Sequence, residues 1–415
     1  MKRMVMKSVE EWYERSREKV LFIRGATGVG KTWLIREFCR ERDTEYIYLS
    51  VPSLSYMSTD YIKKSATLIV FDDINSLSDM EKAADILSEI KADERLRGYD
   101  VIMAGQIADD KMYDYVFPNK DIVEYLEMYP MNFSEFYTAV SPKYKFGKFD
   151  ILKMYMITGG MPDVVKIFLE DGNLTKVRAC QRVLMEKMFR SFNDGGGCKT
   201  SKEEEILWSV SEQMSCKSTG FTFRQVNKNA RAREYENAID NLLLHGIIYR
   251  IYRFAPKSDH GIANYKLMIF DIGLWGMLAG MSETAVFEER EIFDREHVAA
   301  FLTQELISYG TKSSYVRYWY KPRAKARLSV VLEMGDKIMP VELMACAGKK
   351  SKSMESFMDM YRVFQVIRVM KPERRACIFD GQKQGVYFKA CNESSFELWE
   401  AGLEVSGILN RLKEL

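Results

Sequence analysis

Histidine is scarce in this 415-residue sequence, which contains only His245, His260 and His297, and none of them lies near another histidine or a cysteine. Chemistry built on histidine pairs or on a Ser-His-Asp relay is therefore not expected. The seven cysteines are widely spaced and include no Cys-x-x-Cys pair. An odd number of isolated cysteines indicates neither a disulfide framework nor a zinc site.

Excess charge and long apolar runs are also absent. Lys and Arg number 61 against 59 Asp and Glu, a net charge of +2, so any contact with nucleic acid must come from local clusters. No stretch approaches the roughly 20 apolar residues of a membrane span. The first twenty residues carry glutamates where a signal peptide needs an apolar segment. We expect a cytoplasmic protein with no membrane partner and about two or three domains.

The strongest pattern is an apolar run at 20–24, followed by a Gly-rich segment ending in Gly-Lys-Thr and by helical spacing over 33–38. This is the G-x-x-x-x-G-K-[ST] motif in its strand–loop–helix context, where backbone N–H groups surround phosphates. Lys31 is expected to reach the β- and γ-phosphates of ATP, and Thr32 to bind Mg²⁺. The expected nucleotide-binding residues are Gly25, Ala26, Thr27, Gly28, Val29, Gly30, Lys31, Thr32 and Trp33.

A second apolar run, residues 67–71, ends in Asp72 and Asp73 about forty residues after the P-loop. A buried parallel strand carrying the acidic residue of a Walker B motif has this pattern. Asp72 is expected to hold Mg²⁺ through water. Asp73 stands where hydrolytic P-loop proteins commonly place a glutamate that polarises water, and its side chain is one methylene shorter. The alternative for this pair is a solvated turn at a strand end.

Strands are also expected at 45–51, 100–106 and 122–126, with a helix at 79–97. Alternating strands and helices predict a parallel sheet with right-handed crossovers. Gln106, at the tip of the strand that follows Asp72 and Asp73, is a candidate sensor of the γ-phosphate or a structural polar residue. The predicted catalytic residues are Lys31, Asp72, Asp73 and Gln106, with Thr32 and Asp72 as metal ligands.

With these residues in hand, the chain resembles a group of prokaryotic AAA-like ATPases in which a P-loop module precedes a winged-helix segment and a C-terminal domain. Besides the P-loop, the resemblance rests on Asp72-Asp73-Ile74-Asn75, Gly105-Gln106, the segment 125–136, Gly159-Gly160-Met161-Pro162, Phe270-Asp271-Ile272-Gly273-Leu274 and Pro340-Val341-Glu342. The family commonly carries Gly-Arg where Asn119-Lys120 stands here, so no cis-acting arginine is implied. Arg182 and Arg190 are candidates for an arginine supplied in trans.

The rest of the chain is predicted to form three further segments. Residues 1–140 are the P-loop ATPase domain, 141–200 a helical lid or connector, 201–290 a winged-helix region and 291–415 a degenerate domain. The middle segment is expected to carry helices at 162–170 and 175–193 and a flexible, Gly-rich joint at 193–197.

For the winged helix we expect helices at 203–216, 222–228 and 231–245 and strands at 247–252 and 264–270. On or before the exposed face of its third helix lie basic and polar residues expected to be available to DNA, namely Arg224, Lys228, Arg231, Arg233 and Asn237. Winged helices in ATPases also serve as lids or protein contacts, and both roles remain open.

The element order after residue 295 resembles restriction-endonuclease-like domains, which bind metal through an Asp on one strand and Glu-x-Lys on the next. Glu342 matches that Glu and Glu305 the helical Glu of such domains. Ser329 stands where the Asp belongs, and Met344 where the Lys belongs. We therefore expect a catalytically inactive nuclease fold, with strands at 315–320, 327–333, 337–343, 364–369, 376–379 and 385–389 and a helix at 353–363.

Two basic clusters of this last segment are candidate phosphate contacts or solvated loops. They are Lys321, Arg323, Lys325 and Arg327, and Lys349, Lys350 and Lys352. The fold class expected is α/β: a P-loop NTPase sheet, a winged-helix region and a restriction-endonuclease-like domain. The function expected is Mg²⁺-dependent ATP hydrolysis that repositions the C-terminal segments, with DNA as a candidate partner and oligomerisation open. The alternative is a nucleotide-gated switch or binding module with negligible turnover.

Overall fold

The computed structural model describes residues 2–15, 20–51, 67–92, 99–106, 123–192, 200–216, 218–255, 264–287, 293–309, 315–345, 351–363, 365–370 and 393–397. It divides into two compact units. The first comprises Met1–Met131, Met161–Asp163 and Asn237–Ile247, and the second comprises Asn132–Gly160, Val164–Glu236 and Ile248–Leu415. None of the helices in the described ranges has both the length and the apolar character needed to span a membrane.

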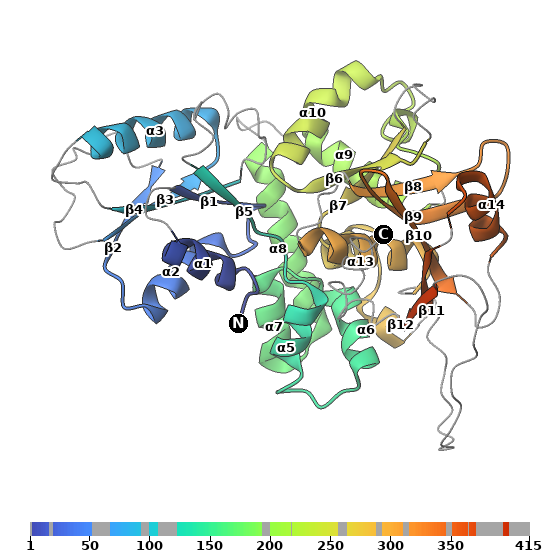
Figure 1. The fold of residues 1–415 in the computed structure, drawn as a ribbon, viewed down its shortest axis with the longest axis horizontal. Coiled ribbons are helices and arrows are strands. Elements are labelled where there is room, and N and C mark those ends of the chain that lie inside the picture. Colours follow the sequence, from blue (N-terminus) through green and yellow to red (C-terminus); the bar gives the residue numbers. More distant parts are fainter. Residues whose placement is uncertain are drawn as a thin grey trace. The chain divides into compact units, whose positions relative to one another are not determined.

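The first unit contains a parallel sheet of five strands in the order β2–β3–β4–β1–β5 (Figure 1). The strands are β1 (Val20–Arg24), β2 (Tyr46–Ser50), β3 (Leu68–Ile74), β4 (Asp100–Gly105) and β5 (Val123–Glu127). All five strands that the sequence predicts for the P-loop domain are present. Because the strands run in parallel, the residues that follow β1, β3 and β4 meet at one edge of the sheet.

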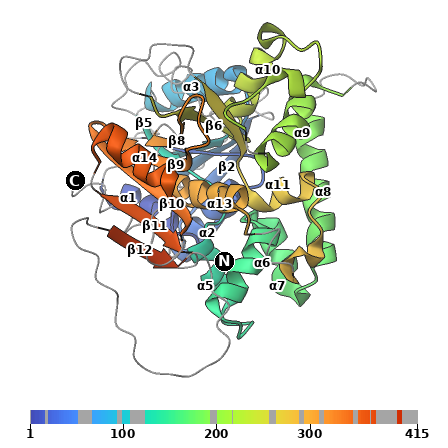
Figure 2. The same ribbon diagram turned by 90° about the vertical axis from the view of Figure 1, so that its right-hand side faces the viewer.

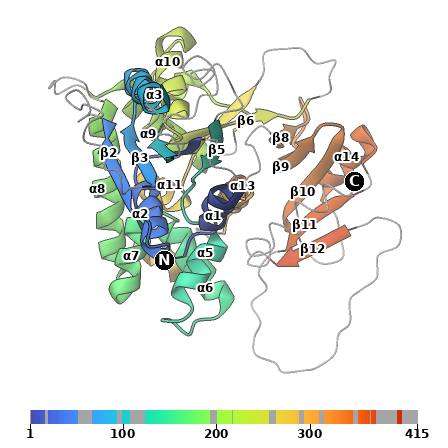
Figure 3. The same ribbon diagram turned by 60° about the vertical axis from the view of Figure 1, so that its left-hand side comes forward.

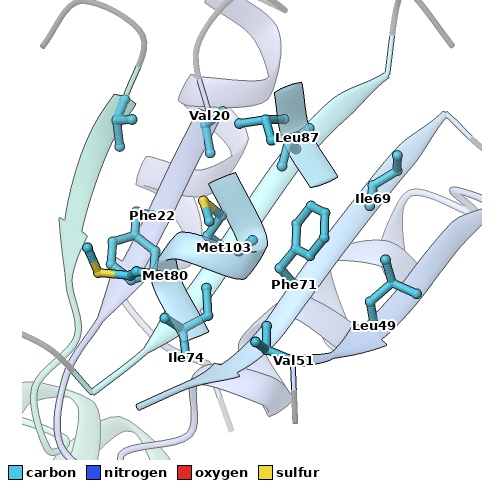
Figure 4. Close-up of a cluster of buried hydrophobic side chains, with 13 residues drawn as sticks. Val20, Phe22, Leu49, Val51, Ile69, Phe71, Ile74, Met80, Leu87 and Met103 are labelled. Carbon is cyan, nitrogen blue, oxygen red and sulfur yellow. The ribbon is translucent and has the colours of Figure 1, made fainter. Parts of the chain in front are cut away.

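Both faces of the three central strands, β1, β3 and β4, are buried, as their apolar runs require. On one face, Phe22, Phe71 and Met103 form a cluster with Met80 and Leu87 of α3 (Leu77–Ala92), as Figure 4 shows. The intervening strand residues are also buried. Two further helices of this unit, α2 (Lys31–Glu41) and α1 (Met6–Arg15), pack on each other. Helix α1 is an element that our sequence analysis did not predict.

The helices of the second unit begin with α5 (Phe133–Val140), α6 (Lys148–Thr158) and α8 (Leu174–Phe192). Between α6 and α8 the chain forms α7 (Pro162–Asp171), whose first two residues group with the first unit. Figure 2 shows α6 and α8 beside α11 (Ile272–Leu278), and these three helices pack on one another. The predicted helices at 162–170 and 175–193 are therefore present, whereas the predicted joint at 193–197 lies outside the described residues.

In the predicted winged-helix region, α9 (Lys202–Ser215) and α10 (Ala232–Leu244) match two of the three expected helices. The expected helix at 222–228 is shorter, a single 3₁₀ turn at Phe223–Gln225. Strands β6 (Ile248–Arg253) and β7 (Tyr265–Ile269) pair antiparallel, as expected for a hairpin. The elements thus follow the expected order, but the second helix is only a short 3₁₀ turn.

That hairpin is part of a larger sheet of seven strands in the order β12–β11–β10–β9–β8–β6–β7 (Figure 3). Strand β6 pairs in parallel with β8, so residues from the predicted segments 201–290 and 291–415 share one sheet. The remaining strands are β8 (Val316–Tyr320), β9 (Arg327–Met334), β10 (Lys337–Ala345), β11 (Val366–Met370) and β12 (Glu393–Glu397). Strand β12 was not predicted, and the predicted strands at 376–379 and 385–389 lie outside the described residues.

Two helices, α13 (Arg295–Ser308) and α14 (Lys352–Tyr361), cover opposite faces of this sheet. Neighbouring strand residues point to opposite faces. Trp319 packs on Phe357 of α14, whereas Tyr318 lines a cavity that α13 also lines. Side chains on β8 and β9 therefore belong either to the α13 face or to the α14 face.

Helix α13 carries a buried carboxyl group, Glu305, that holds the start of α5. The backbone N–H of Phe133 donates to both Glu305 oxygens, at 3.1 and 2.9 Å, and the Tyr155 hydroxyl donates to Oε1 at 3.0 Å. Gln304 Nε2 in turn donates to the Tyr155 hydroxyl oxygen at 2.8 Å. Glu305 thus supplies an acceptor that the first N–H of α5 lacks within its own helix.

Asp271 plays a similar part at the turn after α6. Its Oδ2 accepts from the N–H of Gly160 at 2.7 Å and its Oδ1 from the N–H of Leu274 at 2.9 Å, which caps α11. A Cβ at Gly159, whose φ is +71°, would lie 2.2 Å from Asp271 Oδ1. The Gly-Gly and Phe-Asp segments that carried the family resemblance therefore form one hydrogen-bonded junction.

We predict that Glu305→Gln removes a pH dependence of stability. Burial raises the pKa of Glu305 from 4.5 to about 8, so between these values the native state binds more protons than the unfolded state. The free energy of unfolding should therefore fall as pH rises through this window and level off above it. In urea titrations, the free energy of unfolding of the variant, relative to that of the wild type, should increase by on the order of a few kcal/mol between about pH 5 and about pH 9.

The matched control is Glu212→Gln, which removes an exposed carboxylate from α9. Its unfolding free energy should follow the wild type at every pH. Equal pH profiles for Glu305→Gln and the wild type would contradict the prediction.

Candidate nucleotide-binding site

The loop between β1 and α2 has the backbone shape of a phosphate-binding loop. A Cβ at Gly25 would lie 2.1 Å from the Met128 carbonyl oxygen, so only glycine fits against this neighbouring segment. Gly30 is the N-cap of α2 with φ +98°, a conformation that side-chain-bearing residues rarely adopt. These glycines let the loop curl so that the first N–H groups of α2 and its positive dipole end face the same region.

Lys31 opens α2 and bends back over the loop. Its ammonium group donates to the carbonyl oxygens of Gly25 at 2.7 Å and Ala26 at 3.0 Å. Burial lowers the Lys31 pKa from 10.5 to about 8, while the charges of Asp72 and Asp73 oppose this shift. A phosphate oxygen would replace the loop carbonyls as a stronger, charged acceptor.

Asp72 is buried at the end of β3, 1 % exposed, next to the predicted metal-binding hydroxyl. Its Oδ2 accepts from the Thr32 hydroxyl at 2.6 Å and from the Tyr48 hydroxyl at 2.7 Å. Its Oδ1 accepts from the backbone N–H of Asp73 at 2.8 Å. The two predicted metal ligands therefore lie in direct contact, and their hard oxygen atoms are of the kind that Mg²⁺ prefers.

Asp73 and Gln106 lie at the same edge of the sheet. Asp73 is exposed, has φ +64°, and its Oδ2 accepts from the Ser50 hydroxyl at 2.9 Å. The pairing of β3 with β4 shifts between Phe71 and Ile74, so the two aspartates leave the regular ladder. Gln106 follows β4, and its N–H donates to the Ile74 carbonyl at 3.1 Å. The structure thus brings Lys31, Thr32, Asp72, Asp73 and Gln106 to one edge.

Two residues of this region were missed by the sequence analysis. Arg3 is 7 % exposed and donates to the carbonyl oxygens of Val29 at 2.8 Å and Tyr129 at 2.6 Å, which fastens the loop. Tyr48 fixes Asp72 from β2. Neither belongs to a motif, and no local pattern in the sequence identifies them. Trp33, placed in the site by the sequence, is 40 % exposed and directly follows Thr32.

The three described positions that we matched to a nuclease motif do not meet. Ser329 lines the cavity on the α13 face. Glu342 accepts from the N–H of Ser351, the N-cap of α14, at 2.6 Å, and its carboxylate pairs with buried Arg368 at 2.8 Å. Glu305 accepts hydrogen bonds from the N–H of Phe133 at the start of α5. The side chain of Met344 lies outside the description.

The basic residues proposed to contact DNA are exposed for the most part. This holds for Arg224, Lys228, Arg231, Arg233 and Asn237, and for Arg323, Lys325 and Lys352. Lys321 and Arg327 are half-buried, and Arg327 lies 3.9 Å from Glu296. The predicted cluster at Lys349 and Lys350 lies outside the described residues, as does Asn119-Lys120. Arg182 and Arg190 are exposed on α8.

Comparison with known proteins supports the P-loop assignment. Residues 17–137 match the AAA domain family, and residues 149–285 match a domain of unknown function, DUF8612. A search of curated proteins gave no match.

Among solved structures, the chain is similar to a Walker-type ATPase of Pyrococcus abyssi, with 11% identity over 66% of this chain and 94% of that one and a TM-score of 0.45. It is also similar to the ORC1 protein of Aeropyrum pernix in complex with DNA, with 10% identity, coverage of 66% and 91%, and a TM-score of 0.33. The RuvB Holliday junction branch migration motor of Thermotoga maritima shares 14% identity, coverage of 59% and 88%, and a TM-score of 0.33.

We predict that ATP affinity declines as pH rises above about 8, because Lys31 then loses the proton that pairs with phosphate. Calorimetric titration of the wild type should show a decline approaching about tenfold per pH unit above that point. Lys31→Met, which has no ammonium, should bind more weakly and without this decline. A wild-type affinity that stays constant up to about pH 10 would contradict a role for the Lys31 charge.

Proposed function

With residues 17–137 forming an AAA-like P-loop domain, we propose that the protein binds ATP with Mg²⁺ and hydrolyses it. The observation that carries this proposal is the 2.6 Å contact between Thr32 and Asp72, beside Lys31 at the start of α2. A hydroxyl, a buried carboxylate and an ammonium group in this arrangement match the needs of a metal-bound triphosphate.

Each side chain has a distinct part in the proposed reaction. The loop N–H groups and Lys31 bind and orient the β- and γ-phosphates and offset the negative charge that develops as water attacks. Thr32 and Asp72 would hold Mg²⁺, which supplies additional charge stabilisation on the phosphate oxygens. Asp73 would orient the attacking water and accept its proton. Gln106, at the end of β4, would contact the γ-phosphate.

A second candidate is a nucleotide-gated switch with negligible turnover. Asp73 favours it, because its carboxylate is held by Ser50 and its backbone has φ +64°. Its side chain is also one methylene shorter than the glutamate usual at this position. Binding without turnover would use Lys31, Thr32 and Asp72 in the same way and leave Asp73 as a structural residue.

The remaining segments are proposed to respond to the nucleotide. We propose that residues 201–290 form a winged-helix region and 291–415 an inactive restriction-endonuclease-like domain that repositions with it. The buried Arg368–Glu342 pair supports inactivity, because an arginine neutralises the carboxylate that a nuclease would offer to metal. DNA is the candidate partner, through the exposed basic residues, and oligomerisation with an arginine in trans remains part of the proposal.

Phosphate release separates the two candidates. Asp73→Asn should abolish hydrolysis while changing ATP affinity by less than about threefold, since it removes only the group that activates water. Asp73→Glu should raise the rate by extending the carboxylate toward that water. The matched control Asp85→Asn, which alters an exposed aspartate on α3, should retain the wild-type rate. Measurements should include Mg²⁺ and be repeated with and without DNA.

The Lys31→Ala variant gives the background rate of phosphate release for that assay. If the wild type releases no more phosphate than this variant while still binding ATP, hydrolysis is excluded and the switch is retained. Equal rates for Asp73→Asn and the wild type would remove Asp73 from the mechanism.

A further inference from the structure

The second unit contains a cavity of about 70 Å³ on the face of the sheet that α13 covers. Strands β6 to β9, α9 and α13 all contribute to its wall. One buried water needs roughly 10–15 Å³ of such space, so the cavity can take a group of several heavy atoms. Most of its lining is apolar, including Met214, Phe221, Leu267 and Met268.

Lys266 places a positive charge at this cavity without a hydrogen-bond acceptor among the described residues. Its ammonium nitrogen lies 5.0 Å from the centre of the Tyr318 ring. Burial lowers the pKa of Lys266; the charge of Glu296 opposes that shift, and the charge of Arg327 adds to it. Lys266 is half-buried, and its ammonium group, which bonds to no acceptor among the described residues, is free to donate to a negative group in the cavity.

Glu296, in the first turn of α13, places a negative charge at the same cavity. Its side chain is 12 % exposed, and its nearest cation is Arg327, 3.9 Å away, too far for a hydrogen bond. Within the described part of the chain, Lys266 and Glu296 do not approach within the 4.0 Å of an ion pair. Two opposite charges thus line one cavity, close enough to act on each other but with no hydrogen bond between them.

We propose that this cavity binds a small zwitterion of the α-amino-acid class, with its carboxylate on Lys266 and its ammonium group on Glu296. The hydroxyls of Thr303 and Ser329 also line the cavity and can complete the hydrogen bonds of the charged groups. The apolar wall would receive an apolar side chain. Ser329, the residue found where a nuclease would carry Asp, keeps a third carboxylate out of this space.

The charge pattern favours a zwitterion over simpler ligands. A carboxylic acid without an amine would satisfy Lys266 and leave Glu296 buried beside a second negative charge. An amine without a carboxylate would pair with Glu296 and leave Lys266 beside a second positive charge. A ligand that carries both charges gives Lys266 and Glu296 a hydrogen-bonding partner each and adds no net charge to the cavity.

The first experiment uses the full-length wild type without nucleotide, so its outcome does not depend on ATP binding. The common L-amino acids are screened by thermal unfolding, and those that raise the Tm are titrated by calorimetry. The best ligand is then compared with its N-acetyl derivative and its methyl ester, each of which lacks one charge. Each derivative should bind at least about tenfold more weakly. No Tm increase with any amino acid, or equal binding of parent and derivatives, would overturn the proposal.

Two isosteric variants assign the charges. Lys266→Met should weaken the amino acid about tenfold or more and leave the affinity for the methyl ester unchanged. Glu296→Gln should weaken the amino acid and leave the N-acetyl derivative unchanged. Lys187→Met and Glu355→Gln, exposed positions outside the cavity, are matched controls and should bind like the wild type. Equal losses for both ligands in each variant would overturn the assignment, and if a variant fails to fold, the wild-type comparison of derivatives decides.

Discussion

The candidate nucleotide site depends on the parallel direction of β1, β3 and β4. Parallel strands deliver all of their carboxyl ends to one edge, so three segments far apart in sequence present polar residues to a single region. The loop approaches the Met128 carbonyl closely at Gly25, and the Arg3 guanidinium donates a hydrogen bond to the loop carbonyl of Val29. The buried Asp72 can then accept a hydrogen bond from Thr32, in the first turn of α2.

The sequence predicted this region well because its information is local. Apolar runs set the strands, and the glycines with Lys31 and Thr32 identify the loop without reference to distant residues. The contributions of Arg3 and Tyr48 could not be predicted, since they depend on side chains reaching across the folded structure to a carbonyl or carboxylate. Helix α1 was missed for a similar reason. Its buried residues are Val9 and Trp12, and the helix packs on α2, a contact that exists only in the folded structure.

The second unit was predicted less well, although most of its elements were expected. Motif spacing placed Ser329 and Glu342 on adjacent strands but could not reveal which face each side chain occupies. The pairing of β8 with β9 contains a register shift, and such a shift changes the face to which later residues point. Three buried carboxyl groups also have different environments: Glu342 has Arg368, Asp271 has backbone N–H groups, and Glu305 has a pKa near 8. The residue type alone does not distinguish these cases.

The parallel pairing of β6 with β8 limits how the chain can move. Tyr252 and Arg253 pair with Arg317 and Tyr318, and the N–H of Phe254 donates to the Tyr318 carbonyl at 2.7 Å. A hinge between the hairpin and the C-terminal strands would break these bonds and expose the faces that α13 and α14 cover. Mechanically, a force applied to the hairpin is transmitted through these backbone hydrogen bonds to the C-terminal strands.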